Sequence, residues 1–453
     1  MKSSTAKQLR KLAKLLPRGE ISFVEKIRRE HSGDKWFTSH LPDAVALPRT
    51  TESVAKILRF ANQNKIPVTA RGAGYGYVGG CVPVRGGIVL SLARMNRIRE
   101  INADDFVAVV QPGVHTQTIQ EAVEKRGLFY PPDPASRADS SIGGNIATNA
   151  GGPRCLKYGV TREYVLGLEV VLADGTIVKL GSRTHKNKTG FDLVKLFIGS
   201  EGMLGVVTEA TLKLLPLPPY RACLSVGFDS MQNAALTIRQ IFRAGFLPSA
   251  VEVADAFTLA AVYQRMKSDR FAGCRAHLIV ELDGQPKSVR DEVAQLEKIA
   301  RSQKPLWIDR GLGSAQCEKI WKLRREFSYS LRDTGLTKLN QDITVPRGRL
   351  EDLFAFAARL QKKHSLPIAC FGHAGDGNIH CNVMVDLTQP KAVEPTSRAA
   401  TPTTGSRSRL TRCSTRTGAP GATRSRSSRR SNASGNASRT TTRMPRHTKS
   451  LPG

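Results

Sequence analysis

Two histidines stand seven residues apart in the segment FGHAGDGNIHCNV, where His373 and His380 flank a GDGN centre and Asn382 follows two residues later. Glycine, Asp and Asn at such a centre favour a tight turn, which predicts that the two imidazoles are brought together. Paired imidazoles can hold a divalent metal, and they can equally be ordinary packed polar groups. Taken alone, the pair leaves both interpretations open.

The segment ARGAGYGYVGG contains the pattern G-x-G-x-x-G between Gly74 and Gly79. A Rossmann dinucleotide turn requires a helix that starts inside this motif and an acidic residue about 20 positions later. Here further Gly and Pro residues and the strand-like run GIVLSL follow, and position 94 is an arginine. We therefore expect no NAD-binding domain, although a loop this rich in glycine can still bind phosphate oxygens through its backbone N–H groups.

A second segment, SSIGGNIATNAGG at 140–152, almost lacks bulky side chains but carries two asparagines and a threonine. Such a segment lets the backbone approach a flat polar heterocycle closely. The alternative interpretation is an irregular glycine loop without a ligand.

The elements around these motifs alternate between helix and strand patterns. A capped helix is expected at 51–65 and a strand at IPVTA, followed by the strands GIVLSLARM and FVAVVQPG and a helix that stops at Gly127. Asp174-Gly175 predicts a hairpin between EYVLGLEVVLA and TIVKLG. Residues 221–388 repeat strand-helix-strand units, which favours a ferredoxin-like α+β layer.

Composition places limits on the class of protein. The 453 residues carry a net charge of +31, and no apolar stretch reaches the ~18 residues of a membrane span. The basic N-terminus lacks the apolar core of a signal peptide, and the eight cysteines form no C-x-x-C pair. We expect a soluble, cytoplasmic protein with at most peripheral membrane association.

The last part of the chain differs from the rest. From Pro390 onward there are 14 Lys or Arg residues against one acid, Glu394, and no Phe, Tyr or Trp. This composition predicts disorder. A solvated tail, an Arg/Ser arm that binds nucleic acid and a stretch that is not native coding sequence all remain open, although without aromatic residues only nonspecific attraction to phosphate is available.

Four motifs together resemble a known family: ARGAGYGYVGG, PPDPAS with SIGGNIATNAGG, GSEGMLGVVTEATLKL and FGHAGDGNIHCNV occur in the order typical of FAD-linked oxidases. These belong to the vanillyl-alcohol oxidase / p-cresol methylhydroxylase flavoprotein superfamily. Within it, the chain is similar to the D-2-hydroxyacid dehydrogenase group, which includes D-lactate dehydrogenase and the FAD subunit of glycolate oxidase. The similarity covers about residues 35–388.

The resemblance implies four parts: an N-terminal helical extension (1–37), a two-part FAD-binding domain (38–220), a truncated substrate domain (221–388) and a disordered tail (389–453). It implies FAD held noncovalently, because Tyr75 occupies the position where covalent relatives often have a histidine. The implied cofactor-binding residues are Gly72, Ala73, Gly74, Tyr75, Gly76, Pro132, Ser141, Gly143, Gly144, Thr148, Asn149, Gly152, Gly159, Glu201 and Val207.

The resemblance also implies the reaction, which is hydride transfer from a small D-2-hydroxy acid to FAD. His373 and His380 would bind Zn or Mn, and Arg324, Ser328 and Lys338 would contact the substrate carboxylate, with Asn382 beside them as a further catalytic residue. A quinone, an iron–sulfur partner subunit or another carrier would then reoxidise FAD.

The chain departs from its family after the histidine motif. Relatives continue with a G-E-H-G segment, whose Glu completes the metal site and whose His is the expected base, and this segment is missing here. A reading-frame shift near positions 388–400 would account for the tail. Three alternatives follow: a chain that binds FAD but is catalytically impaired, a nucleic-acid-binding protein with a vestigial folded region, and a flavoprotein with redox-neutral ether-lipid chemistry.

Overall fold

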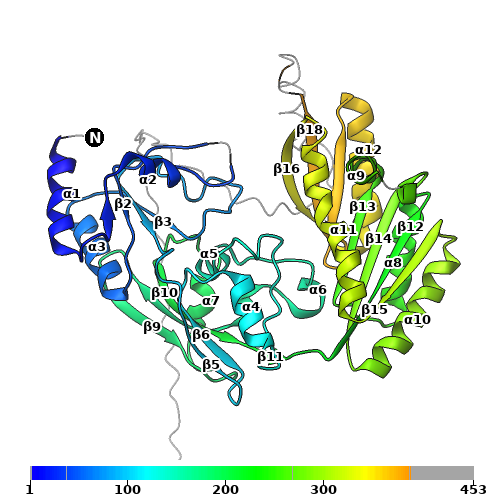
Figure 1. The fold of residues 1–453 in the computed structure, drawn as a ribbon, viewed down its shortest axis with the longest axis horizontal. Coiled ribbons are helices and arrows are strands. Elements are labelled where there is room, and N and C mark those ends of the chain that lie inside the picture. Colours follow the sequence, from blue (N-terminus) through cyan, green and yellow to red (C-terminus); the bar gives the residue numbers. More distant parts are fainter. Residues whose placement is uncertain (1–2, 37, 268, 387, 389–453) are drawn as a thin grey trace, which may run out of the picture. The chain divides into compact units, whose positions relative to one another are not determined.

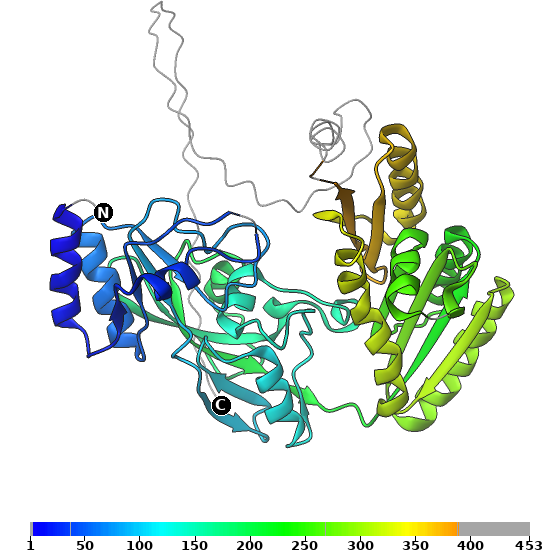
Figure 2. The same cartoon turned by 45° about the horizontal axis from the view of Figure 1, so that its top comes forward.

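The computed structural model describes residues 3–36, 38–267, 269–386 and 388 (Figures 1 and 2). The predictions made for the tail at 389–453 lie outside these residues. Mixed sheets and helices fill the described part, which confirms the expected α+β class. Within this part, no helix combines the length and apolar character needed to cross a membrane.

The first sheet has four strands in the order β1-β2-β4-β3, of which the last three run parallel. Its strands are β1 (Ile21–Ser22), β2 (Ala44–Ala46), β3 (Val68–Arg71) and β4 (Ile88–Ser91). The predicted helix after β2 is α3 (Thr51–Gln63), and the Thr50 hydroxyl caps it by accepting the Ser53 N–H at 3.2 Å. Before β2 come α1 (Ser3–Leu15), which buries Leu9 and Leu12 in the same core, and α2 (Glu25–Glu30).

The second sheet has five antiparallel strands in the order β5-β6-β10-β8-β9. They are β5 (Ile98–Asn102), β6 (Val107–Val110), β8 (Val165–Val171), β9 (Ile177–Gly181) and β10 (Val206–Lys213). β8 and β9 form the predicted hairpin, and Gly175 in its turn has φ +83°. Residues of α4 (Thr116–Glu124) and α5 (Ile142–Thr148) complete the core of this sheet.

Shorter elements connect these sheets. They are β7 (Leu128–Phe129), which pairs with β11 (Leu215–Pro216), the helices α6 (Cys155–Tyr158) and α7 (Leu193–Phe197), and the 3-10 turn η1 (Thr161–Tyr164).

The third sheet has seven antiparallel strands in the order β15-β12-β14-β13-β17-β18-β16. They are β12 (Tyr220–Phe228), β13 (Ala250–Asp255), β14 (Ala276–Gly284), β15 (Trp307–Leu312), β16 (Thr337–Thr344), β17 (Ile368–His373) and β18 (Asn378–Val385). Strand-helix-strand units build it, as the sequence predicted.

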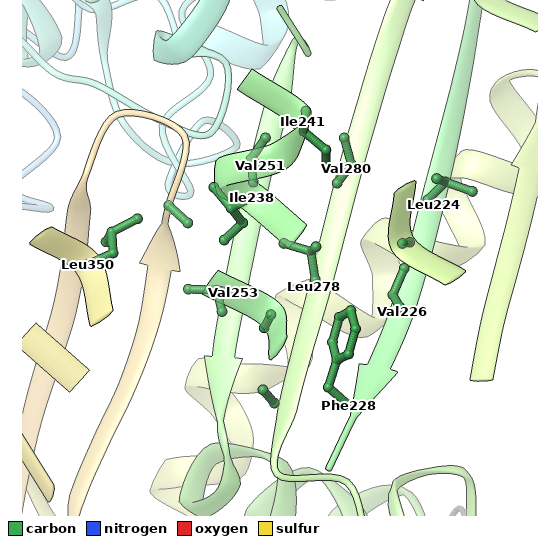
Figure 3. Packing of buried hydrophobic residues seen from close by; sticks show 14 of the residues in the cluster. Leu224, Val226, Phe228, Ile238, Ile241, Val251, Val253, Leu278, Val280 and Leu350 are labelled. Atoms are coloured by element: carbon green, nitrogen blue, oxygen red, sulfur yellow. The ribbon is translucent and has the colours of Figure 1, made fainter. Parts of the chain in front are cut away.

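Helices cover both faces of this sheet. One core packs α8 (Met231–Arg243), α10 (Pro286–Ser302) and α12 (Leu350–His364) against residues such as Val251 and Val253 of β13 (Figure 3). The other core packs α9 (Ala256–Met266) and α11 (Ser314–Arg332) against Ala254 of the same strand. Successive residues of a strand point to opposite faces of the sheet. The β13 residues that pack against α9 and α11 therefore alternate with those that pack in the first core. The 3-10 turns η2 (Asp269–Phe271) and η3 (Arg347–Arg349) complete the described elements.

Candidate active site

The glycine loop at 72–80 connects β3 to β4, which are neighbouring parallel strands. Within the described residues 72–87 no helix begins, so the structure confirms that the G-x-G-x-x-G pattern is not a Rossmann turn. The loop instead contacts α5: a Cβ atom on Gly72 would lie 2.6 Å from Ser141 Oγ. A side chain at position 72 would therefore separate the loop from this helix.

The third glycine segment, GSEGMLG, also meets α5. The N–H groups of Gly199 and Glu201 donate to the carbonyls of Ile146 and Ala147 at 3.0 and 2.9 Å. Glu201 has a φ of +52°. Three segments that are far apart in the sequence, 72–80, 141–152 and 199–207, are thus brought together around one short helix.

Two glycines in this region have no room for a side chain. A Cβ atom on Gly143 would lie 2.6 Å from Pro112 Cβ, and one on Gly152 would lie 2.0 Å from the carbonyl oxygen of Asp133. Neither a backbone carbonyl nor the rigid ring of a proline can give way as a flexible side chain can. These positions therefore require glycine so that the loops can approach one another closely.

A cavity of about 450 Å³ lies beside the third glycine segment. Its size falls in the range of about 300–1,000 Å³ that is usual for cofactor pockets. It is lined by residues 201–206 together with residues of β3, the glycine loop, α3 and the end of β8: Leu58, Ala61, Asn62, Ile66, Val68, Thr69, Ala70, Gly80, Val82, Val171 and Ala173. Most of the residues that border it are small or apolar, which is compatible with a flat aromatic group such as adenine.

The remaining cofactor-binding candidates lie around the same loops. Ala73, Gly74 and Tyr75 line a second hollow of about 310 Å³, together with Arg71 and with residues 29–30, 32–36, 38 and 39. Gly76 O accepts the Lys35 N–H at 3.0 Å. Lys35 Nζ also lies 4.5 Å from the centre of the Tyr75 ring.

Other candidates in this group serve the local structure. Pro132 O accepts from Gln120 Nε2 at 2.9 Å, Thr148 Oγ1 donates to Gly144 O at 3.0 Å, and Ser141 Oγ accepts the Gly144 N–H at 3.4 Å. Asn149 ends α5 in a left-handed conformation, and its Oδ1 accepts the Arg162 N–H at 2.9 Å. Gly159 has φ +81°, and Val207 lies half-buried in β10 against the core of the second sheet. Their contact with a cofactor stays a prediction.

The two histidines come together as the spacing predicted. β17 and β18 form a hairpin in which His373 pairs with Asn378, so His380 is the diagonal neighbour of His373 on the same face. The centres of the two imidazole rings lie 5.2 Å apart.

Each histidine has a carboxylate directly opposite it on a neighbouring strand. Glu252 of β13 pairs with His373, and Asp342 of β16 pairs with His380. His373 Nδ1 lies 2.5 Å from Glu252 Oε1, and His380 Nδ1 is hydrogen-bonded to Asp342 Oδ1. Within the described part of the chain, neither Nε2 atom has a hydrogen-bond partner. The sheet register therefore orients both rings with the same nitrogen available.

Glu252 also holds Arg324. The guanidinium Nε of Arg324, on α11, donates to Glu252 Oε2 at 2.6 Å, and its plane lies over Phe327 and Phe371 at 5.2 and 4.9 Å. The Glu252 side chain is only 1% exposed. Burial alone would raise the pKa of Glu252, but the nearby His373 and Arg324 outweigh it and lower the pKa to about 2. Burial would in turn lower the pKa of His373, yet the Glu252 carboxylate raises it above its usual value.

The other predicted substrate residues surround this cluster. Lys338 Nζ donates to Ser328 Oγ at 3.2 Å, and Ser328 lies one helical turn after Arg324 on α11. Burial lowers the pKa of Lys338. Asn382 is fully buried, and its amide donates to the carbonyls of Ala369 and His380 at 3.1 Å each. Asn382 therefore braces the hairpin, and its direct part in catalysis stays a prediction.

The site offers two imidazole nitrogens to a metal. Among the described residues, no group of three or more His, Cys, Asp or Glu side chains is arranged to hold an ion. His373 and His380 would hold an ion through their Nε2 atoms, and substrate oxygens would have to supply further ligands. The two imidazole donors fit Zn better than Mn, which favours oxygen ligands, and the number of protein ligands is small.

Reasoning from the sequence missed Glu252 and Asp342. The sequence does indicate that Glu252 is unusual, because it stands in SAVEVAD, where all the remaining residues from 249 to 254 are apolar or small. A carboxylate inside a buried strand is expected to have a charged partner. Nothing local to Asp342 shows that it pairs with His380, since that depends on the register of β16 with β18.

Comparison with known proteins agrees with this geometry. A model of an FAD-binding domain matches residues 42–181, and a model of the C-terminal domain of FAD-linked oxidases matches residues 217–405. The chain belongs to the FAD-linked oxidases, a family of FAD-dependent oxidoreductases, and FAD is its cofactor. The resemblance found in the four motifs is thereby confirmed.

Particular relatives narrow the group. The chain is 38% identical to glycolate oxidase subunit GlcD of Bacillus subtilis over 359 residues, which cover 79% of this chain and 76% of that protein. It is 34% identical to D-lactate dehydrogenase of Anaerostipes hadrus, with 75% and 73% covered. The solved structure of p-cresol methylhydroxylase with bound substrate has the same fold, with a TM-score of 0.72, 19% identity and coverage of 88% of this chain and 86% of that one.

Proposed function

We propose that this chain oxidises a small D-2-hydroxy acid, of the lactate or glycolate type, to the 2-oxo acid. The observation that carries the proposal is the shared carboxylate of Glu252, which holds Arg324 and His373 beside His380. A 2-hydroxy acid has a carboxylate and a hydroxyl on adjacent carbons. The cluster offers a guanidinium for the first and imidazole nitrogens for the second. Similarity to a glycolate oxidase subunit and to a D-lactate dehydrogenase supports this substrate class.

Arg324 binds the substrate carboxylate in this proposal. Its Nε is taken by Glu252, and within the described residues its two Nη groups have no hydrogen-bond acceptor. Two parallel N–H groups match the two oxygens of a carboxylate. Lys338 adds a positive charge nearby, and its donor Nζ is held by Ser328.

His373 and His380 act on the substrate hydroxyl. They would hold Zn or Mn through their Nε2 atoms, and such an ion would lower the pKa of the bound hydroxyl. The hydroxyl would lose its proton to solvent water, and the carbon would lose its α-hydrogen as a hydride to FAD, so that the C–O bond becomes a carbonyl.

The glycine segments around α5 hold FAD, which when bound supplies the oxidant that takes the α-hydrogen as a hydride. The cavity beside residues 201–206 suits the adenosine half. Tyr75 in place of a histidine supports noncovalent binding. An electron carrier, either a quinone or an iron–sulfur partner subunit, would then accept the two electrons, and the subunit name of the Bacillus subtilis relative supports such a partner.

A second candidate is a chain that binds FAD but turns over poorly. It is favoured by the number of metal ligands, because the described residues supply two imidazoles and no third ligand to the same ion. FAD binding would be the same in both cases. The two candidates differ only in the rate at which substrate reduces the flavin.

Anaerobic titration of the purified protein separates these candidates. We expect a visible flavin spectrum that bleaches on addition of D-lactate or glycolate and not of L-lactate. A flavin that binds but stays oxidised with every D-2-hydroxy acid would favour the impaired chain. Bleaching by L-lactate in preference to D-lactate would contradict the substrate assignment.

A further inference from the structure

The carboxylate of Glu252 divides its two oxygens between two functional groups. Oε1 faces His373 Nδ1 at 2.5 Å, and Oε2 accepts from Arg324 Nε at 2.6 Å. These partners come from β17 and α11, which are 121 and 72 positions further along the chain. Among the described residues, only Glu252 is hydrogen-bonded to both side chains.

The geometry fixes which atoms remain for a ligand. An ionised carboxylate can only accept, so the neutral ring of His373 carries its proton on Nδ1 and presents Nε2 with a free lone pair. The Nε of Arg324 is occupied by its hydrogen bond to Glu252, and the two Nη groups at the end of the guanidinium remain for a ligand. A carboxylate bound through those Nη groups and an oxygen held at Nε2 are then placed by the same buried side chain.

His380 repeats the arrangement with Asp342. The two carboxylates lie on the outer strands of the four-stranded segment β13-β17-β18-β16, and the two imidazoles lie on the inner ones. Asp342 is 49% exposed, whereas Glu252 is 1% exposed and has the second partner. Of the two carboxylates, Glu252 therefore has the larger role in orienting the side chains of the site.

We propose that Glu252 is a positioning residue that fixes the tautomer of His373 and the distance between His373 and Arg324, so that both act on one small 2-hydroxy acid. This inference rests on the proposed function for the identity of the ligand. The positioning itself is a property of the protein and can be measured without turnover.

Glu252→Gln tests the inference with little change in shape. Arginine can only donate, so Arg324 Nε takes the single oxygen of the new amide and His373 then faces its NH₂ group. His373 must accept through Nδ1, which moves its own proton to Nε2. Long-range ¹H–¹⁵N spectra of histidine-labelled, FAD-loaded protein, with His373 assigned from a His373→Asn sample, report this tautomer directly.

We expect Nδ1–H in the native protein and Nε2–H in the Glu252→Gln protein. We also expect the Kd for a 2-oxo acid, read from the flavin spectrum, to rise about 10- to 100-fold, because Arg324 and His373 lose the charged carboxylate that orients both. FAD content per folded chain should stay the same. At a pH where the ring is neutral, an unchanged tautomer, or a native ring protonated on Nε2 alone, would overturn the inference.

Glu281→Gln is the matched control. Glu281 lies on the adjacent strand β14, is also 1% exposed, and accepts from Trp321 of α11 at 2.5 Å and from Arg221 at 3.4 Å. Its loss removes a buried charge without touching either histidine of the pair. We expect lower stability but the native tautomer of His373 and the native Kd; equal changes in both variants would show that Glu252 has only a structural role.

The two proposals fail separately. If the tautomer changes as expected but no 2-hydroxy or 2-oxo acid perturbs the flavin spectrum, the positioning holds and the substrate class is wrong. If the acids bind and reduce the flavin while the tautomer is insensitive to Glu252→Gln, the substrate class holds and the positioning is wrong.

Discussion

The segments around α5 act through their backbone, whereas the cluster around Glu252 acts through side chains. In the first region the important feature is the absence of side chains at glycine positions. A Cβ atom on Gly152, for example, would lie 2.0 Å from the Asp133 carbonyl oxygen. In the second it is the pairing of charges, with one buried carboxylate between a guanidinium and an imidazole. The difference teaches that the two regions tolerate different substitutions, because one depends on shape and the other on hydrogen-bond chemistry.

Gly152→Val should have the largest effect and should act on the cofactor. The added side chain must displace backbone at Asp133, which we expect to cost about 3 kcal/mol and so to weaken FAD binding about 100-fold. The measurement is the flavin absorbance of the purified protein and its recovery on titration with FAD. Gly348→Ala is the control, since a Cβ atom there has nothing within 4 Å; a fully FAD-loaded Gly152→Val protein would contradict the close approach of these loops.

Arg324→Lys should leave FAD bound and weaken the substrate side. Lysine keeps the charge but loses the planar fork, so it cannot serve Glu252 and a carboxylate together. We expect the Kd of a 2-oxo acid, read from the flavin spectrum, to rise about 10- to 30-fold, which corresponds to about 1.4–2 kcal/mol. Arg325→Lys, at an exposed neighbour that pairs with Glu318, should change it less than about twofold. Equal effects of the two substitutions would argue against a bound carboxylate at Arg324.

Chelation of a divalent ion should have a moderate effect, and it should act on the side-chain cluster around Glu252, not on the FAD-binding segments. In the proposed mechanism a divalent ion on His373 and His380 lowers the hydroxyl pKa, so its removal should slow flavin reduction by D-lactate about tenfold. Added Zn or Mn should restore the rate, and FAD content should not change. A rate indifferent to the chelator, in protein shown by elemental analysis to be metal-free, would remove the metal from the proposed mechanism.

His277 can be compared with His373. Both are buried histidines, but the hydrogen-bond partner of His277 is a hydroxyl and that of His373 is a carboxylate. The Nε2 of His277 lies 2.8 Å from Ser225 Oγ, and burial lowers the pKa of His277 from 6.5 to about 3. The unfolded chain binds a proton below about pH 6.5 that the folded chain excludes down to about pH 3, so the free energy of unfolding should fall as pH falls through this window. The expected slope from this group is up to about 1.4 kcal/mol per pH unit. Chemical unfolding at several pH values should show a shallower fall for His277→Gln, and an identical fall would assign the acid sensitivity to other groups.

The two regions also differ in how far the sequence predicted them. The glycine segments were found from the sequence because their requirement is local: each motif can be read within about 15 residues, and together they indicated FAD. The hairpin of His373 and His380 was found for the same reason, since a GDGN turn brings them together. The α3 cap at Thr50 and the Asp174-Gly175 hairpin are likewise short-range features.

Glu252 and Asp342 were missed because their roles depend on strand order and register. Glu252 becomes the partner of His373 only after β17 has inserted next to β13, more than 100 residues later in the chain. A shift of one residue would turn either carboxylate to the other face of the sheet. The composition of SAVEVAD could have indicated a buried charge, but not the identity of its partners.

The most direct test of the account is a crystal structure of the FAD-loaded protein with a bound 2-oxo acid. We predict that the carboxylate of the acid lies within hydrogen-bond distance of the Arg324 Nη groups, with its 2-oxo oxygen beside the Nε2 atoms of His373 and His380 and with Glu252 still bonded to both partners. An acid bound elsewhere, with Arg324 and the histidines untouched, would contradict the central claim.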